Sequence, residues 1–441
     1  MTGLYKAQRA MRQKRRSALQ RGVLAVLDIG TSKIVCLILR VEQAAAPGDL
    51  GALAGQAGLR VIGAATTCSR GVRFGEIHSL RETESAIRTA VQMAQKMAGT
   101  RVDHVIVSFA GGRPRSYGLS GSHRLEGGVV RDADIAAVLA ACEMPDIGAG
   151  RDAIHAQPVN FVIDHRTGLT DPRGQVGNTL GVDMHLLTVD TAAIEAVLHA
   201  VKRCDLELAG IAAAPYAAGL AALVEDEKEL GAACIDMGGG TTSISLFLRR
   251  HMIYADVVRL GGAHVTSDIA KGLQIPMTEA EKLKTVHGGL IATSQDDREE
   301  IEIPPASGDD PHERRRITRA DLIAIIRPRV EEILEEVRAI LDAVGFDEMP
   351  SRRIVLTGGA SQLVGIDRLA SNILGQNLRL GRPMRIRGLP QSASGPSCSA
   401  AVGLALFAAN PQDECWDFDL PRERATGRTL RRAIRWLREN W

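Results

Sequence analysis

The sequence has few aromatic residues. Phenylalanine, tyrosine and tryptophan together make up 3% of its 441 residues, although 45% of the chain is hydrophobic. Two of the three tryptophans, Trp436 and Trp441, fall in the closing stretch "RTLRRAIRWLRENW". So uneven a distribution indicates that the end of the chain has a role that differs from that of the body.

Other absences exclude whole classes of protein. The seven cysteines are scattered and form no CxxC pair, which predicts a reducing compartment and no disulfide framework or zinc site. No apolar run approaches the roughly 20 residues of a membrane span. The run that follows residues 9–21 is strand-like and contains an acid, unlike the apolar region of a signal peptide, so a soluble body is expected. The sequence contains no HExxH, GxSxG or GxxxxGK[ST] pattern, which excludes those metalloprotease, hydrolase and P-loop classes.

Charge is distributed unevenly along the chain. The formal net charge is only +2, but the first 21 residues contain seven lysines and arginines and no acid, and the tail is also basic. Basic ends suit anionic lipid or nucleic acid, and they also serve simply as solvated arms. Residues 1–21 are predicted to be a flexible arm. Because this arm has no interleaved aromatics and no base-reading motif, we expect no nucleic-acid partner.

The body repeats one motif roughly half a chain apart. Residues 23–42 and 231–250 each contain an apolar run, an aspartate, a Gly-Thr turn and a second apolar run, the pattern of a β-hairpin. Such turns bind phosphate through backbone N–H groups and hydroxyls, and an aspartate in each suits an intervening Mg²⁺ that keeps its waters. Asp28 and Asp236 are the candidate metal residues, acting through water. The candidate phosphate residues are Asp28, Gly30, Thr31, Ser32, Lys33, Gly238, Gly239, Gly240, Thr241 and Thr242.

A third glycine-rich segment follows an apolar strand at "RRIVLTGGASQL". The Gly-Gly turn predicts a helix that begins directly after it and carries Leu363, Ile366, Leu369 and Ile373 on one face. The positive N-terminus of such a helix suits a nucleotide. The candidate residues for the nucleoside here are Gly358, Gly359, Ala360 and Ser361.

These three segments together resemble the actin-like ATPase superfamily. Within it, "QPVNFVIDHRTGLTDPRGQVGNTLGVDMHLLTV", "RLGGAHVTSDIAKGLQIPMTEAEKLK", "IIRPRVEEILEEV" and "IRWLRENW" resemble the FtsA family of bacterial cell-division proteins. The resemblance extends from about Leu24 to Trp441. It implies a two-lobed α/β fold with ATP and Mg²⁺ between the lobes, in which Glu281 and Lys284 are further candidates for the nucleoside.

The resemblance also implies a division of the chain. Residues 22–110, 186–215 and 385–410 would form the core of the first lobe, and residues 111–185 an FtsA-type inserted subdomain. Residues 216–261 and 330–384 would form the core of the second lobe, with 262–329 as its small subdomain. That subdomain would bind the C-terminal peptide of FtsZ, with Arg327 and Arg329 as candidate contacts. The family assembles into filaments, binds other division proteins and lies on the cytoplasmic face of the inner membrane at the division septum.

Two departures from the superfamily pattern concern hydrolysis. Ser243 stands where the second phosphate motif often has an acid, and the stretch "APYAAGLAAL" lacks the Gln or Glu that orients the attacking water in actin-like hydrolases. Water positioning supplies a large part of a hydrolase's rate. We therefore expect ATP binding with slow turnover. A sugar or metabolite kinase of the same superfamily is the alternative class, but such an enzyme would have no use for a lipid-seeking tail.

The tail predicts an amphipathic membrane-targeting helix over residues 428–441, after a flexible linker over residues 411–427. Four apolar residues share one helical face, three arginines lie beside and behind it, and one tryptophan sits at the border, where such a ring prefers the lipid headgroups. The alternative is a terminal helix packed on the body. The candidate membrane residues are Leu430, Ile434, Trp436, Leu437, Trp441, Arg431, Arg435 and Arg438.

Overall fold

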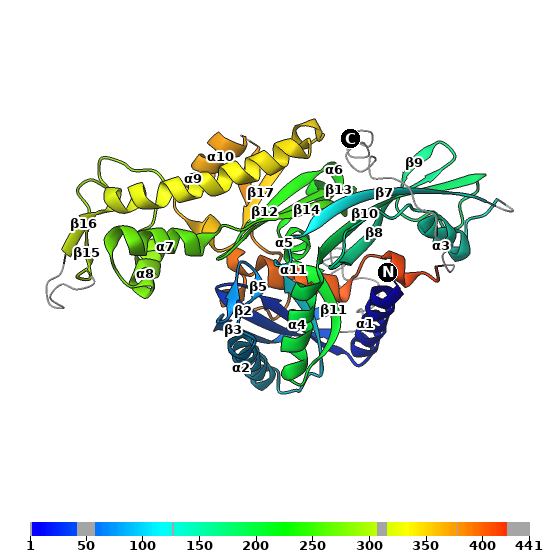
Figure 1. The fold of residues 1–441 in the computed structure, drawn as a ribbon, viewed down its shortest axis with the longest axis horizontal. Coiled ribbons are helices and arrows are strands. Elements are labelled where there is room, and N and C mark those ends of the chain that lie inside the picture. The colour runs from blue at the N-terminus through cyan, green and yellow to red at the C-terminus, as the bar shows by residue number, and fades with distance from the viewer. Residues whose placement is uncertain (1, 42–57, 126–127, 307–314, 376, 421–441) are drawn as a thin grey trace.

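A computed structural model describes residues 2–41, 58–125, 128–306, 315–375 and 377–420. Three β-sheets with their helices account for most of it (Figure 1). The two larger sheets lie one above the other in this view, and an extension lies on each side at the level of the upper sheet. No helix in the described ranges is both long enough and apolar enough to span a membrane.

The first sheet has the strand order β11-β6-β1-β2-β3. Strands β1 and β2 form the first predicted hairpin, antiparallel with Leu27 opposite Cys36, while β6 and β11 add to β1 in parallel. The elements are β1 (Val23–Ile29), β2 (Lys33–Val41), β3 (Leu59–Cys68), β4 (Val72–Arg73), β5 (Glu76–Ile77), α2 (Leu80–Ala98), β6 (His104–Phe109), α4 (Thr191–Arg203) and β11 (Glu207–Ala213). The long apolar runs of β1 and β2 are buried on both faces, as helices above and below the sheet require.

The second large sheet repeats this arrangement in the order β14-β13-β12-β17-β18. Strands β12 and β13 form the second predicted hairpin, with Asp236 opposite Ser243, and β17 pairs with β12 in parallel. The elements are α6 (Glu225–Leu230), β12 (Ala232–Met237), β13 (Thr242–Leu248), β14 (His251–Val258), β17 (Arg353–Thr357), α10 (Ile366–Leu374) and β18 (Leu378–Leu380). Both predicted hairpins are therefore confirmed.

Each large sheet carries an extension. From the first, α3 (Asp132–Ala140) covers a sheet of order β7-β10-β8-β9, made of β7 (Arg115–Arg124), β8 (Arg151–Ile163), β9 (Arg166–Leu169) and β10 (Thr179–Asp190). From the second come α7 (Gly262–Leu273), α8 (Met277–His287), β15 (Glu300–Ile303), β16 (Arg315–Thr318) and the long helix α9 (Arg319–Ala343). Helix α9 runs along the top of both this extension and the second sheet (Figure 1).

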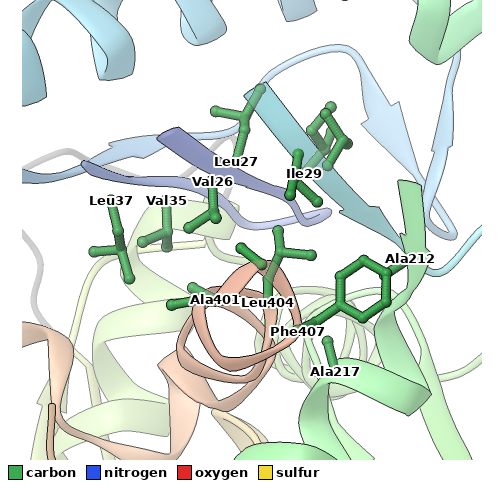
Figure 2. Close-up of a cluster of buried hydrophobic side chains, with 14 of the residues drawn as sticks. Val26, Leu27, Ile29, Val35, Leu37, Ala212, Ala217, Ala401, Leu404 and Phe407 are labelled. Carbon is green, nitrogen blue, oxygen red and sulfur yellow. The ribbon is translucent and has the colours of Figure 1, made fainter. Parts of the chain in front are cut away.

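Two helices lie between the large sheets, α5 (Ala214–Ala222) and α11 (Ser399–Ala409). Figure 2 shows Val26, Val35 and Leu37 of the first sheet pointing toward α11, which presents Ala401 and Leu404 to them. Small residues let α5 and α11 approach closely: a Cβ added at Gly403 would lie 1.6 Å from the carbonyl oxygen of Ala217. Between the sheets, the backbones of α5 and α11 are therefore in direct contact.

The N-terminal prediction is wrong, because residues 2–20 form helix α1 (Thr2–Gln20) packed on the body. Ala18 is buried, Met11 and Leu19 pack against the first core, and four basic side chains, those of Arg9, Arg12, Lys14 and Arg16, have acidic partners. Arg12 reaches Glu414 and Asp417, and Lys14 reaches Glu207. The absence of acids within residues 1–21 suggested a solvated arm, but the neutralising acids come from distant parts of the chain.

The predicted linker is also wrong over its described part. Residues 411–420 lie against α1 and the inserted sheet, with Glu414 and Trp416 buried and a 3-10 turn at Cys415–Asp417. Pro411 and the polar residues around it suggested an extended connection. The acids here instead pair with α1, and Trp416 and Phe418 complete the core beneath α3. The rest of the linker and the whole predicted membrane helix lie outside the described residues.

All seven cysteines are free, in line with the prediction of no disulfide framework. His264 accepts a hydrogen bond from the backbone N–H of Gly261 on Nδ1 at 3.1 Å and stacks on Phe74. His264 therefore packs at the start of α7 and caps it.

Candidate functional site

The two predicted phosphate turns are built alike. In the first, the N–H of Gly30 donates to the carbonyl of Lys33 at 3.1 Å, and in the second the N–H of Gly238 donates to that of Thr241 at 2.9 Å. A Cβ at Gly30 or Gly238 would lie 2.8 or 2.9 Å from that same carbonyl oxygen. Only glycine allows so tight a return from one strand to the next.

The structure brings the two turns into contact. A Cβ at Gly239 would lie 2.9 Å from that of Ser32, and one at Gly240 would lie 2.5 Å from Oγ1 of Thr31. The Thr31 hydroxyl in turn accepts a hydrogen bond from the N–H of Gly75 at 3.1 Å. The chain thus juxtaposes two glycine-rich turns that are more than 200 residues apart in the sequence.

Asp28 and Asp236 lie behind these turns and influence each other's charge. Asp28 is buried and accepts a hydrogen bond from Oγ of Ser108 at 2.7 Å, and burial raises its pKa. Burial, and next the charge of Asp28, raise the pKa of Asp236 to about 7, against the opposing effect of Lys33. Asp236 nevertheless retains partial solvent exposure. Two such carboxylates disfavour each other's ionised form, and a bound cation would relieve the repulsion.

The donor set fits Mg²⁺ better than a metal caged by protein. The described residues contain no group of three or more His, Cys, Asp or Glu side chains that could hold a metal ion. Mg²⁺ commonly binds through one or two carboxylates and keeps its other positions for water and phosphate. Asp28 and Asp236, with the open turns beside them, supply that kind of site.

The third glycine-rich segment, around Gly358, lies against Asp236. Gly358, at a positive φ of 92°, approaches so closely that a Cβ there would lie 2.3 Å from Oδ1 of Asp236. The expected helix does not begin directly after it, because a 3-10 turn at Ala360–Gln362 intervenes and α10 begins at Ile366. Ser361 is occupied with the carbonyl of Gly358, and Gly365, at φ 85°, redirects the chain before the helix.

Lys284 and Ala360 lie on either side of one glycine. A Cβ at Gly262 would lie 3.4 Å from that of Ala360 and 3.5 Å from Nζ of Lys284. The Lys284 ammonium donates to Oε2 of Glu281 at 2.6 Å, to Oγ1 of Thr266 and to the carbonyl of Gly262. The predicted nucleoside residues of helix α8 and of the Gly-Gly turn are therefore neighbours.

Sequence reasoning missed two contributors. Ser108, at the end of β6, orients Asp28, and no motif marks it. The other is the turn Pro396–Cys398, where Lys33 donates to Oγ of Ser397 at 2.9 Å and contacts Sγ of Cys398 at 3.2 Å, while Gly358 donates its N–H to the carbonyl of Pro396. The run of small residues "SCSAAVG" was the available signal, because such a run marks a place of close backbone approach.

Arg327 and Arg329, the candidate peptide contacts, have partners on their own domain. Arg327 pairs with Glu331 along α9, and Arg329 pairs with Asp268 of α7 at 2.6 Å and with Glu332. A partner peptide would have to displace or share these acids. A role for the two arginines in peptide binding stays a prediction.

Helix α5 presents no side chain that could orient water. Its residues are buried, and the hydroxyl of Tyr216, its one polar side chain, donates to Gln412. The side chains of this helix include no carboxylate or amide. Slow turnover, the expectation drawn from "APYAAGLAAL", therefore stays a prediction.

The fold is that of the actin-like ATPases. Of solved structures, the PilM-PilN type IV pilus biogenesis complex aligns over 88% of this chain and 99% of its own, with a TM-score of 0.58 at 18% identity. MreB5 of Spiroplasma citri bound to ADP aligns over 87% of this chain and 95% of its own, with a TM-score of 0.52 at 15% identity.

Sequence comparison then identifies the family. The profile described as "Cell division protein FtsA" matches residues 233–403, and "SHS2 domain inserted in FTSA" matches residues 111–188. A cell division protein FtsA of Rhizobium meliloti (strain 1021) is 43% identical over 389 residues, 87% of this chain and 87% of that protein. The chain belongs to the FtsA family of cell-division proteins, and the inserted sheet is the SHS2 domain of that family.

Proposed function

We propose that the chain is an ATP-binding, actin-like cytoskeletal protein that anchors the FtsZ ring to the inner face of the cytoplasmic membrane and helps to recruit later division proteins. The observation that carries the nucleotide part is the contact between the two Asp-Gly-Thr hairpins, with Gly358 and its turn against Asp236. Family membership supports the role in division. The anchoring role is drawn from the basic, tryptophan-containing tail.

Each group of site residues would bind a different part of the nucleotide. The N–H groups of Gly239 and Gly240, with the Thr31 and Thr242 turns, would bind phosphate, and Lys33 would neutralise it. Asp28 and Asp236 would hold Mg²⁺ through water, and Lys284 with the Gly358–Ser361 turn would contact the nucleoside. Bound Mg²⁺ supplies charge neutralisation for the phosphates. Ser108 keeps Asp28 oriented toward the turn.

Turnover of ATP should be slow. No polar side chain of α5 is free to orient an attacking water, and Ser243 replaces an outer acid of the second motif. Nucleotide would then act through binding, by favouring one arrangement of the two large sheets and with it assembly into filaments. Measured steady-state hydrolysis as fast as that of an efficient sugar kinase would contradict this part.

The nucleotide assignment is tested by Asp236→Asn. Without this carboxylate, Mg²⁺-dependent affinity for a fluorescent ATP analogue should fall by about tenfold or more, since one charged ligand contact contributes roughly 1.5–3 kcal/mol. Asp171→Asn, an exposed change in the inserted domain, is the matched control and should bind as the wild type does. Equal affinity of all three proteins, with and without EDTA, would refute the site. Phosphoryl transfer to a sugar or other small hydroxyl compound would favour the kinase alternative.

A further inference from the structure

The segment Gln412–Asp417, which opens the predicted linker, is held to the body by buried ion pairs and hydrogen bonds as well as by the packing of Trp416. Arg12 of α1 reaches Oε2 of Glu414 at 3.2 Å and Oδ2 of Asp417 at 2.7 Å, and it donates to the carbonyl of Gln412 at 3.3 Å. Both carboxylate side chains and that of Arg12 are at most 10% exposed. We call α1 together with residues 412–417 the clasp.

The clasp contacts both helices that lie between the large sheets. The Tyr216 hydroxyl of α5 donates to Oε1 of Gln412 at 3.1 Å. The guanidinium of Arg15, which is buried in α1, lies over the ring of Phe407 of α11, 5.1 Å from its centre. Figure 1 shows α1 beside the orange-red C-terminal segment, close to these helices.

A buried histidine adds a second connection to α5. His155 accepts from the backbone N–H of Ala213, the residue before α5, on Nε2 at 3.1 Å. Its Nδ1 therefore carries the proton and donates to Oε1 of Glu414 at 2.8 Å. The start of α5 is thus joined to Glu414 by two consecutive hydrogen bonds through one rigid ring.

Some buried polar atoms in and around the clasp have no hydrogen-bond partner. Half of the buried side-chain atoms without a hydrogen-bond partner in the described residues lie in or near it, on Gln8 of α1, on Gln157 beside Glu414 and on Trp416. Buried polar atoms are nearly always paired in stable interiors. Although Trp416 packs in the core, the ion pairs of this segment lie within an incompletely paired polar interior, which suits it to local opening.

Helix α5 also reaches the second hairpin. Ser245 of β13 donates its hydroxyl to the carbonyl of Pro215 at 2.9 Å, and the turn before β13 is the second phosphate turn. A shift of the second sheet relative to the first therefore has to move α5, and α5 is bound to Gln412 and Glu414. The path from phosphate turn to C-terminal segment consists of packed, hydrogen-bonded contacts throughout.

We propose that the clasp couples the nucleotide site to the root of the C-terminal tail. Binding of nucleotide shifts α5, and through Tyr216 and His155 it changes how firmly residues 412–417 are held. In this proposal, helix α1 holds residues 412–417 on the body and thereby sets the point from which the tail extends. The inference rests on the proposed nucleotide binding.

The test is hydrogen–deuterium exchange of the full-length protein with and without MgATP. In the wild type, residues 412–418 and the two phosphate turns should both change exchange rate on addition of nucleotide, by about threefold or more. In Arg12→Met, residues 412–418 should exchange about tenfold faster without nucleotide and should no longer respond to it, while the turns still respond.

Two further variants keep the test decisive if Arg12→Met does not fold. Asp417→Asn preserves shape and weakens the same ion pair, so it should show a smaller change in the same direction. Lys14→Met removes the ion pair between α1 and Glu207 of β11 and leaves the contacts of residues 412–417 in place, so it should behave as the wild type does. Turns that respond while residues 412–418 do not would overturn the coupling alone. Turns that fail to respond would overturn both the coupling and the proposed nucleotide binding.

Discussion

Buried ionisable side chains depend on partners that local sequence does not reveal. Burial raises the pKa of Glu414, but the charge of Arg12 and the hydrogen bond from His155 outweigh it, and the result is a pKa below its usual range. Burial, and then the neighbouring Arg12, lower the pKa of Arg15 to about 10. Each of these groups would be costly to bury alone, so each holds its position only while its partner does.

His185 provides a test of this dependence. Burial, and then the nearby His155, lower its pKa to about 3, so His185 is neutral in the folded protein. An unfolded histidine takes up a proton below pH 6.5, so the stabilisation is complete above that pH and is lost as the pH falls toward 3. The free energy of unfolding should decline by up to about 1.4 kcal/mol per pH unit in this window from His185 alone.

His185→Gln should remove that contribution. Urea unfolding at pH 7, 6 and 5 measures it, and the decline with acidification should be shallower for the variant than for the wild type. His165→Gln, at an exposed turn between β8 and β9, is the matched control. Identical slopes for His185→Gln and the wild type would show that this histidine does not titrate differently in the two states.

At the scale of elements, the crossing of α5 and α11 is the closest approach at any glycine in the described residues. A Cβ at Gly403 would lie 1.6 Å from the Ala217 carbonyl oxygen, and neither backbone can move without disturbing the sheet it covers. Gly403→Ala should therefore lower the free energy of unfolding by about 3 kcal/mol or more. Thermal unfolding followed by circular dichroism measures the loss.

The chain offers a close control for this change. Gly395 has no atom within 4 Å of its would-be Cβ and has a negative φ, so Gly395→Ala should leave the melting temperature nearly unchanged. Equal melting temperatures of the two variants would mean that α5 and α11 are farther apart than the structure has them.

At the scale of the whole molecule, membrane attachment should depend on assembly. Each partly buried apolar residue of the tail would contribute about 1–2 kcal/mol, and each arginine near anionic lipid about 1 kcal/mol. Ordering a helix of some 14 residues would offset much of this, so one tail should bind reversibly. Several tails on one filament should bind far more tightly, because all after the first would attach intramolecularly.

Removing residues 427–441 should abolish co-sedimentation with anionic vesicles and, with it, the recruitment of FtsZ to them. Binding of the full-length protein should increase steeply with protein concentration and with MgATP, as assembly requires. A variant with Arg431, Arg435 and Arg438 changed to glutamine should keep the apolar face and lose only the preference for anionic lipid. Undiminished vesicle binding after truncation would refute the tail as anchor.

Local patterns in the sequence were sufficient for the two hairpins, the aspartate behind each turn and the glycines that shape the turns. These features depend on residues a few positions apart, and the periodicity of a strand or the tightness of a turn is visible at that range. The lack of a water-orienting residue in "APYAAGLAAL" was readable for the same reason. The resemblance to a known family then supplied the overall arrangement.

Only the tertiary structure decided what happens to charges whose partners are far away. Judged by its own composition, each of the segments 1–21 and 411–420 suggests a solvated segment. Together they form a buried ion-paired interface, because Arg12 and Glu414 are some 400 positions apart and only the path of the chain brings them together. Ser108 and the Pro396–Cys398 turn have the same character: their role is set by what folds against them.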